Sequence, residues 1–332
     1  MFISATVILL LACIAWLLYP MLRELGWPRD AAQFDIDQGF AREPRFFGIM
    51  LRRALEPYAV RHPGGNLVRT QLLDGHHKVI SIAGDIRASN ASRLGDVLVS
   101  VGSVFVEEAC TMPIALVRGE VTTDSRAQLT ALAADGSIRL GRRSRVALWI
   151  DAEGDVVASE NCDLGNSTSA GGSIRLTTGC SFGRLFGRPI MTTTSSPMLS
   201  ITPALIGRVA SERDRLSVGH GTLVSHDIVS PAPIRLGADS VVRGSLKSYA
   251  SIEVFSGARV EGSMFARGSV IVHPGARIFG NVYAEGEIWL ASFVRVGAEH
   301  AFISVYSGRS IVICNSVCIY GWVLAEQGGI VR

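Results

Sequence analysis

Residues 252–287 read IEVFSGARVEGSMFARGSVIVHPGARIFGNVYAEGE, which is one eighteen-residue pattern written twice. Both rows carry aliphatic residues at the first, ninth and thirteenth positions and glycine at the eleventh. These positions are held by Ile252, Val260, Met264 and Gly262, and then by Val270, Ile278, Val282 and Gly280. A unit of short apolar runs broken by glycine cannot bury its own hydrophobic side, so successive units must stack. The pattern therefore predicts an all-β fold, a parallel β-helix (β-solenoid) with about 18 residues per coil.

The same period extends in both directions from this stretch. In the C-terminal direction small insertions interrupt it, and its first position recurs at Leu216, Ile234, Ile288, Ile311 and Ile330. A weaker echo in the first half of the chain spaces three residues eighteen apart, namely Ile138, Val156 and Ile174. Residues 189–215 lose the period and concentrate Thr, Ser and Pro, which is typical of a linker. The sequence thus predicts a β-rich or solenoid block at 66–188, a linker at 189–215 and a second block at 216–332.

A glycine-alanine motif characterises the second block. The run G-A-x-[VI]-x-G-x-[MV]-x-A-x-G occurs at 257–268 and again at 275–286. With this motif, residues 216–332 resemble the bactofilins, a bacterial family of polymer-forming cytoskeletal proteins. The resemblance covers about a third of the chain and implies a right-handed β-helix that self-assembles without nucleotide. It also implies a scaffold that organises envelope or cell-wall proteins at the membrane.

The N-terminus predicts one transmembrane helix, a departure from the short N-terminal segment of many bactofilins. Residues 2–22 carry no charge, and about 20 helical residues cross a hydrocarbon core of roughly 30 Å. Trp16 and Tyr19 fall where aromatic rings favour the interface, and Arg23 follows directly. Because no Lys or Arg precedes the helix, the positive-inside rule predicts a single-pass protein of the inner membrane with its bulk in the cytoplasm. A cleaved signal peptide is the alternative, but it requires a basic n-region.

Residues 23–65 are expected to form a juxtamembrane segment. Within it, residues 43–60 place apolar side chains near helical spacing with several arginines among them. This pattern indicates an amphipathic helix, for which two interpretations are open. The helix lies on the inner leaflet of the membrane, or it covers the body of the protein.

The composition excludes two classes of protein. The chain has 332 residues, of which 48% are hydrophobic, and a net charge of +3, so it is too apolar to be disordered. That charge supplies no concentrated basic field, so no nucleic-acid partner is expected. Six cysteines form no CxxC pair and no disulfide framework. Cys162 and Cys180, one period apart, are expected to be small core residues with free thiols.

The last coils are the expected site of self-association. The sequence stops at Ile330-Val331-Arg332, three residues into a new coil. An open strand edge there would be a template for pairing with another chain. We expect homo-oligomers that form around Ile311, Ile313, Val323 and Ile330, and dimers where the other end is blocked.

An enzyme is the alternative to a scaffold. Eighteen residues are three hexapeptides, the spacing of left-handed β-helix acyltransferases, whose chemistry uses a histidine base. His226 and His300 are the candidate catalytic residues, and the other histidines of the second block are His220 and His273. His76-His77 lacks companion ligands at metal spacing. A carbohydrate lyase would require an acidic and basic cluster, for which the residues to inspect are Asp151, Asp155, Arg184 and Arg188. We favour a scaffold with no catalytic residue, cofactor or metal.

Overall fold

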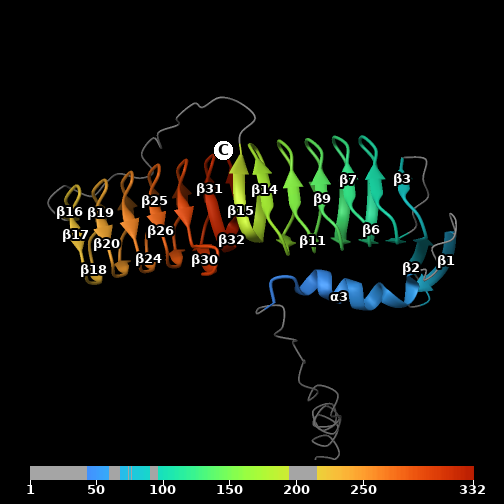
Figure 1. Ribbon diagram of the computed structural model, residues 1–332, viewed down its shortest axis with the longest axis horizontal. Helices are drawn as coiled ribbons and strands as arrows, with labels where there is room; N and C mark the ends of the chain where they lie inside the picture. The colour runs from blue at the N-terminus through green and yellow to red at the C-terminus, as the bar shows by residue number, and fades with distance from the viewer. Residues whose placement is uncertain (1–42, 60–67, 74, 76, 90–95, 194–214) are drawn as a thin grey trace, which may run out of the picture. The chain divides into compact units, whose positions relative to one another are not determined.

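The computed structural model describes residues 43–59, 68–73, 75, 77–89, 96–193 and 215–332 (Figure 1). The transmembrane helix predicted at 2–22, with Trp16, Tyr19 and Arg23 at its end, lies outside these ranges. Within the described ranges, no helix has both the length and the apolar character that a membrane span requires.

From Pro44 onward the described chain is a β-solenoid built as two blocks of stacked coils. The first block contains α3 (Phe46–Leu55), η1 (Glu56–Tyr58), β1 (Val68–Leu73), β2 (His77–Ile82), β3 (Ile86–Ala88), β4 (Val97–Ser100), β5 (Val104–Val106), β6 (Thr111–Val117), β7 (Val121–Thr123), β8 (Gln128–Ala134), β9 (Ile138–Leu140), β10 (Arg145–Val146), β11 (Trp149–Ala152), β12 (Val156–Ala158), β13 (Ser167–Ala170), β14 (Ile174–Thr177) and β15 (Ser181–Thr193). The second block contains β16 (Leu216–Val218), β17 (Leu223–Val224), β18 (Ile228–Ser230), β19 (Ile234–Leu236), β20 (Val241–Val242), β21 (Leu246–Ser248), β22 (Ile252–Val254), β23 (Arg259–Val260), β24 (Met264–Ala266), β25 (Val270–Val272), β26 (Arg277–Ile278), β27 (Val282–Ala284), β28 (Ile288–Leu290), β29 (Arg295–Val296), β30 (Ile303–Ser307), β31 (Ile311–Ile313) and β32 (Cys318–Val331).

The register of the parallel strands confirms the eighteen-residue period. First-column residues of the second block lie side by side on consecutive coils, in the order Ile234, Ile252, Val270, Ile288 and Ile311. The same alignment in the first block joins Ile138, Val156 and Ile174. Two of the earlier coils are one residue shorter, because Val104 lies beside Val121 and Val121 beside Ile138, whereas Ile86 and Val104 are again eighteen apart. These two shorter coils break the spacing of eighteen that joins the later ones.

Side chains alternate between core and surface along the short strands. In β24, for example, Met264 and Ala266 are buried and Phe265 is exposed. Buried residues of both blocks belong to a single hydrophobic cluster. Stacking thus gives each coil the covered apolar layer that it cannot form alone.

Cys162 and Cys180 are buried free thiols on neighbouring coils, as the sequence predicts. The Cys162 thiol donates to the Gly141 carbonyl and the Cys180 thiol to the Ser159 carbonyl, each over 3.1 Å. The hydrogen bond with Cys180 and then burial raise the pKa of Cys162, which suppresses its reactive thiolate. We expect both thiols to resist N-ethylmaleimide in the folded protein and to react after unfolding, as measured by mass spectrometry. Rapid modification of either thiol in the folded chain would contradict this placement.

The two blocks join through their C-terminal coils. β15 pairs with β32 in antiparallel orientation, with Leu185 beside Val323 and Ser181 beside Ile330 (Figure 1). The expectation of an open strand edge at the last coil is therefore wrong, because β15 occupies that edge. β15 also continues to Thr193, so the first block reaches into the range expected to be linker.

Helix α3 covers one face of the first block. Leu55 packs with Val97, Val99 and Leu116, which point away from the interior of the coils. The covered strands are apolar at successive positions, as in Val97–Leu98–Val99, because both of their faces are buried. This arrangement corresponds to the second interpretation of residues 43–60, a helix that covers the body of the protein.

Candidate assembly site

The residues predicted for self-association lie within the last coils and their junction with the first block. Ile311, Ile313 and Val323 are fully buried, and Val323 pairs with Leu185 of β15. Ile330 is half-exposed, but its backbone pairs with that of Ser181. This edge contributes to a contact inside one chain and is not open to a second copy.

The open end of the solenoid is the first coil of the second block. Among the described residues, β16, β17 and β18 pair on one side only, with β19, β20 and β21. Leu216 is 41% exposed, whereas Ile234, its neighbour on the next coil, is 0% exposed. The other inward residues of this coil, Val218 and Val224, are only partly buried, whereas Leu236 and Val242 beside them are 0% exposed. At outward positions the same coil presents Leu223 and Val229, which are 59% and 61% exposed. The apolar core of this block thus ends in an uncovered layer flanked by free strand edges.

The opposite end of the structure is protected differently. β1 runs antiparallel along the edge of β2, with Val68 beside Ile82, and so interrupts the parallel stacking. The centre of β1 is polar, with the sequence Arg69-Thr70-Gln71, while Val68 and Leu72 on either side of it are each 60% exposed. Charged and polar edge strands resist pairing with other chains. The first coil of the second block is therefore the better candidate for assembly.

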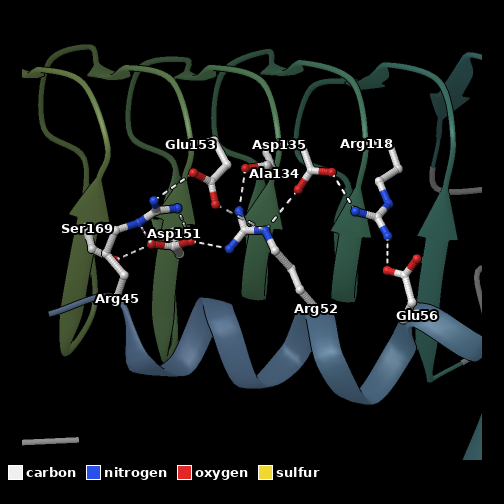
Figure 2. A network of polar contacts seen from close by, with 9 residues as sticks. All are labelled: Arg45, Arg52, Glu56, Arg118, Ala134, Asp135, Asp151, Glu153 and Ser169. Carbon is white, nitrogen blue, oxygen red and sulfur yellow. Dashed lines mark hydrogen bonds and ion pairs between the residues drawn. The ribbon is translucent and has the colours of Figure 1, made fainter. Parts of the chain in front are cut away.

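Ion pairs fix α3 to the first block (Figure 2). Two nitrogens of Arg45 lie 2.9 Å from the carboxylate oxygens of Asp151, which also accepts a hydrogen bond from Arg52. The Ser169 hydroxyl donates to the same carboxylate over 2.7 Å. The Asp151 side chain is only 1% exposed. Gly48 lies directly over it, and a β carbon at that position would overlap the carboxyl group. A buried charge needs such partners, so Asp151 is stable only while α3 is docked.

A second carboxylate extends this network along the helix. Asp135 lies 2.9 Å from Arg52 Nε and 2.7 Å from Arg118 Nη1, and Arg118 also bonds Glu56 (Figure 2). Burial alone would raise the pKa of Asp135, but hydrogen bonds from Arg118 and Arg52 outweigh it and hold that pKa below its usual range. The hydrogen bond to Asp135 in turn raises the pKa of Arg118.

This pKa shift predicts how the docking of α3 depends on pH. Because the folded pKa of Asp135 is depressed, its contribution to stability is present above the usual range for aspartate, about pH 4, and is lost as the pH falls through the folded pKa. We expect Asp135→Asn to lower the thermal midpoint at pH 7, and the difference from the parent chain to shrink on acidification. A difference that is constant from pH 7 to pH 3 would contradict the role of Asp135.

The four candidates for a carbohydrate lyase, Asp151, Asp155, Arg184 and Arg188, form no ion pair with one another within the described residues. Asp151 is sealed beneath α3, and Asp155 accepts hydrogen bonds from the backbone and hydroxyl of Ser173. The Arg188 guanidinium lies 4.5 Å from the ring centroid of Phe302.

The candidate catalytic histidines are separate and exposed. No hydrogen bond or ion pair joins His226 or His300 to another residue of the described ranges. The exposed His220 lies 4.0 Å from Asp239, and His273 Nε2 lies 3.0 Å from Glu253 Oε1. The last pair was not predicted, because its members lie on neighbouring coils. No group of three His, Cys, Asp or Glu side chains suitable for a metal occurs in the described part of the chain.

The strand register and the core define the class of this protein as a β-solenoid of two joined blocks. No protein-family model, curated protein or solved structure matches the chain. The resemblance of residues 216–332 to the bactofilins stays a prediction from the sequence.

Proposed function

We propose that this protein is a membrane-anchored β-solenoid scaffold of the right-handed, bactofilin type that pairs with a second copy of itself. The observation that carries the proposal is the uncovered apolar layer at the first coil of the second block. The inward residues Leu216, Val218 and Val224 leave there a surface that each later coil of this block buries against its neighbour. The outward residues Leu223 and Val229 add exposed apolar side chains at the rim of this coil. A free edge of this kind is a template for further strand pairing.

The junction between the blocks shows how two coil ends of this chain meet. β15 and β32 each belong to a terminal coil, and they pair in antiparallel orientation. Two copies related by a twofold axis would bring their first coils together with the same antiparallel relation. Such an interface is isologous and closes on itself, so the proposed assembly is a dimer and not a filament.

The membrane anchor and the partner proteins are proposed from the sequence alone. The uncharged segment at 2–22 would anchor the chain in the inner membrane, and the excess of arginine after it would place the solenoid in the cytoplasm. The bactofilin-like motif supports envelope or cell-wall proteins as the partners that the scaffold organises. The role needs no cofactor.

Cross-linking of the full chain in membranes tests the proposed contact. In a background with Cys13→Ser and Cys318→Ser, we expect Leu223→Cys to give a dimer band with a short bismaleimide linker. Phe293→Cys is the matched control, because Phe293 is comparably exposed but lies on a later coil. Equal cross-linking of both variants, or of neither, would overturn the proposal.

A second candidate, an acyltransferase, is supported by one observation. His273 bonds Glu253 and its ring stacks on Phe255, with centroids 4.7 Å apart, so an oriented histidine base is present on the surface. The test is acyl transfer from a thioester donor by the purified chain. Activity that is lost in His273→Ala, or in the His226→Ala and His300→Ala variants, would favour this candidate over the scaffold.

A further inference from the structure

One face of the second block carries a row of exposed aromatic side chains. Phe265, Tyr283 and Tyr306 occupy the same outward position on consecutive coils, in the paired strands β24, β27 and β30. Lys247 holds this position on β21, and Tyr249 follows it two residues later. Tyr249, Phe265 and Tyr283 are 52%, 43% and 40% exposed. Contiguous exposed apolar surface of this kind marks an interaction site.

The aromatic row borders a groove of about 540 Å³, which is lined by Lys247, Tyr249, Phe265, Arg267, Tyr283 and Glu285. Arg267 and Glu285 are 3.8 Å apart and both exposed, so this weak pair can reorganise around a ligand. Lys247 Nζ lies 5.4 Å from the centre of the Tyr249 ring. Aromatic side chains at the centre with charged groups at the rim are typical of protein interfaces, where Tyr and Arg supply most of the binding energy.

The charge around the groove selects the partner. The adjacent face presents Arg259, Arg277 and Arg295 at one position on consecutive coils, all exposed. Arg259 has a carboxylate partner in Glu261 at 3.3 Å, whereas Arg277 and Arg295 form no ion pair within the described residues. Like charges placed directly opposite destabilise a sheet, so these two arginines favour a counter-charge from outside. With Lys247 and Arg267 in the groove itself, cationic side chains predominate, and an acidic partner is complementary.

The ring geometry argues for a peptide and against a carbohydrate. Tyr283 and Tyr306 stack face to face, with centroids 4.9 Å apart and planes 9° apart, and Phe265 lies 6.4 Å from Tyr283. One ring face of Tyr283 is thus covered by Tyr306, and Phe265 is tilted by 38° against Tyr283, so a sugar would not find a flat, continuous row of open ring faces. The exposed ring edges are electropositive and fit carboxylate oxygens or the face of another aromatic ring. A flat bilayer surface would leave the groove unfilled.

We propose that this groove binds an acidic peptide segment of a partner protein, anchored by an aromatic side chain. The proposal rests on the scaffold function, because it names the surface by which the scaffold holds a partner. The groove lies on the side of the coils, whereas the proposed dimer contact lies at the end of the stack.

A peptide selection tests the proposal. The full chain, kept in a detergent without a sugar head group, is panned with a phage library of random dodecapeptides. The Tyr249→Ser/Phe265→Ser double variant serves for counter-selection. We expect the enriched peptides to combine Asp or Glu with Trp, Tyr or Phe. No enrichment over the double variant, or enrichment of basic peptides, would overturn the proposal.

Binding of the leading synthetic peptide is then measured by fluorescence anisotropy. We expect affinity to fall at least about tenfold in Tyr249→Ser alone and in Lys247→Glu/Arg267→Glu. Phe293→Ser, an exposed aromatic residue outside the groove, should change it less than about twofold. An equal loss of peptide affinity in the Phe293→Ser control would overturn the proposal. Saturable binding of anionic vesicles or chitin oligomers that requires Phe265 and competes with the peptide would overturn it as well.

The two proposals fail in different ways. Leu223→Lys should abolish pairing of copies and leave peptide affinity unchanged, because Leu223 does not line the groove. Peptide binding that is lost together with pairing would overturn a separate groove site. Peptide binding without any pairing would overturn only the dimer.

Discussion

Asp151→Ala is expected to release α3 from the solenoid and to lower the free energy of unfolding by about 3–5 kcal/mol. The carboxylate of Asp151 is buried and receives donors from Arg45, Arg52 and Ser169. Its removal leaves two guanidinium groups that are largely shielded from water without their main counter-charge. Urea titration of the full chain measures the loss, and faster hydrogen exchange of the α3 peptide reports the release.

Glu107→Ala is the matched control for this change. It removes the Arg87–Glu107 pair, which has a distance of 2.8 Å but lies at the surface. Exposed pairs contribute about 0–1 kcal/mol, so stability and exchange of α3 should stay near those of the parent chain. Similar losses in both variants, or unchanged protection of α3 in Asp151→Ala, would show that the buried network does not hold the helix.

Leu185→Asp is expected to separate the two blocks. Leu185 is fully buried and pairs with Val323 within the junction of β15 and β32, so the new carboxylate would have neither water nor a partner. The loss expected from deleting the leucine side chain alone is about 2–5 kcal/mol, and the buried charge adds to it. We expect a lower thermal midpoint by calorimetry and two transitions in place of one.

Val157→Asp provides the comparison for the junction variant. Val157 lies on β12, a strand of the same block, but at the outward position and partly exposed. Its replacement should shift the midpoint little. One cooperative transition in Leu185→Asp, at the midpoint of the parent chain, would contradict the junction as a structural contact.

The sequence predicts the coil and its period because one physical rule repeats along the chain. Each row places aliphatic residues on the inner side and glycine at the corner, so Ile252 predicts Val270 and Val270 predicts Ile288. The two seventeen-residue coils before Ile138 follow the same pattern of inward residues, but their length differs by one residue. The face covered by α3 can also be recognised in the sequence, because Val97, Leu98 and Val99 are all apolar and do not alternate with polar residues.

The contacts between distant segments could not be predicted, because no local rule connects them. Asp151 occupies an outward position, which by itself indicates a solvated charge. Its burial follows from a helix about a hundred residues earlier, with Gly48 leaving room for the carboxylate. Its neighbours on the adjacent coils, Ala133 and Ser169, have small side chains, and this is the sequence feature that indicates room for a covering segment. The pairing of β15 with β32 likewise requires the second block to run opposite to the first. The eighteen-residue period carries no information on this relative direction.

This reversal gives the candidate assembly site its significance. Because the last coils of both blocks are used inside the chain, the first coil of the second block is the apolar coil end that remains for a second copy among the described residues. One such end per chain gives a closed pair. An internal junction would thereby limit a solenoid of polymer-forming type to dimers.

The molar mass of the detergent-solubilised full chain, measured by light scattering at micromolar concentration, tests the central claim most directly. The proposed assembly predicts the mass of two chains for the parent and of one chain for the Leu223→Lys/Val229→Lys variant, with both keeping the same thermal midpoint of the coils. A parent chain that is monomeric at all concentrations, or a variant that remains dimeric, would contradict it.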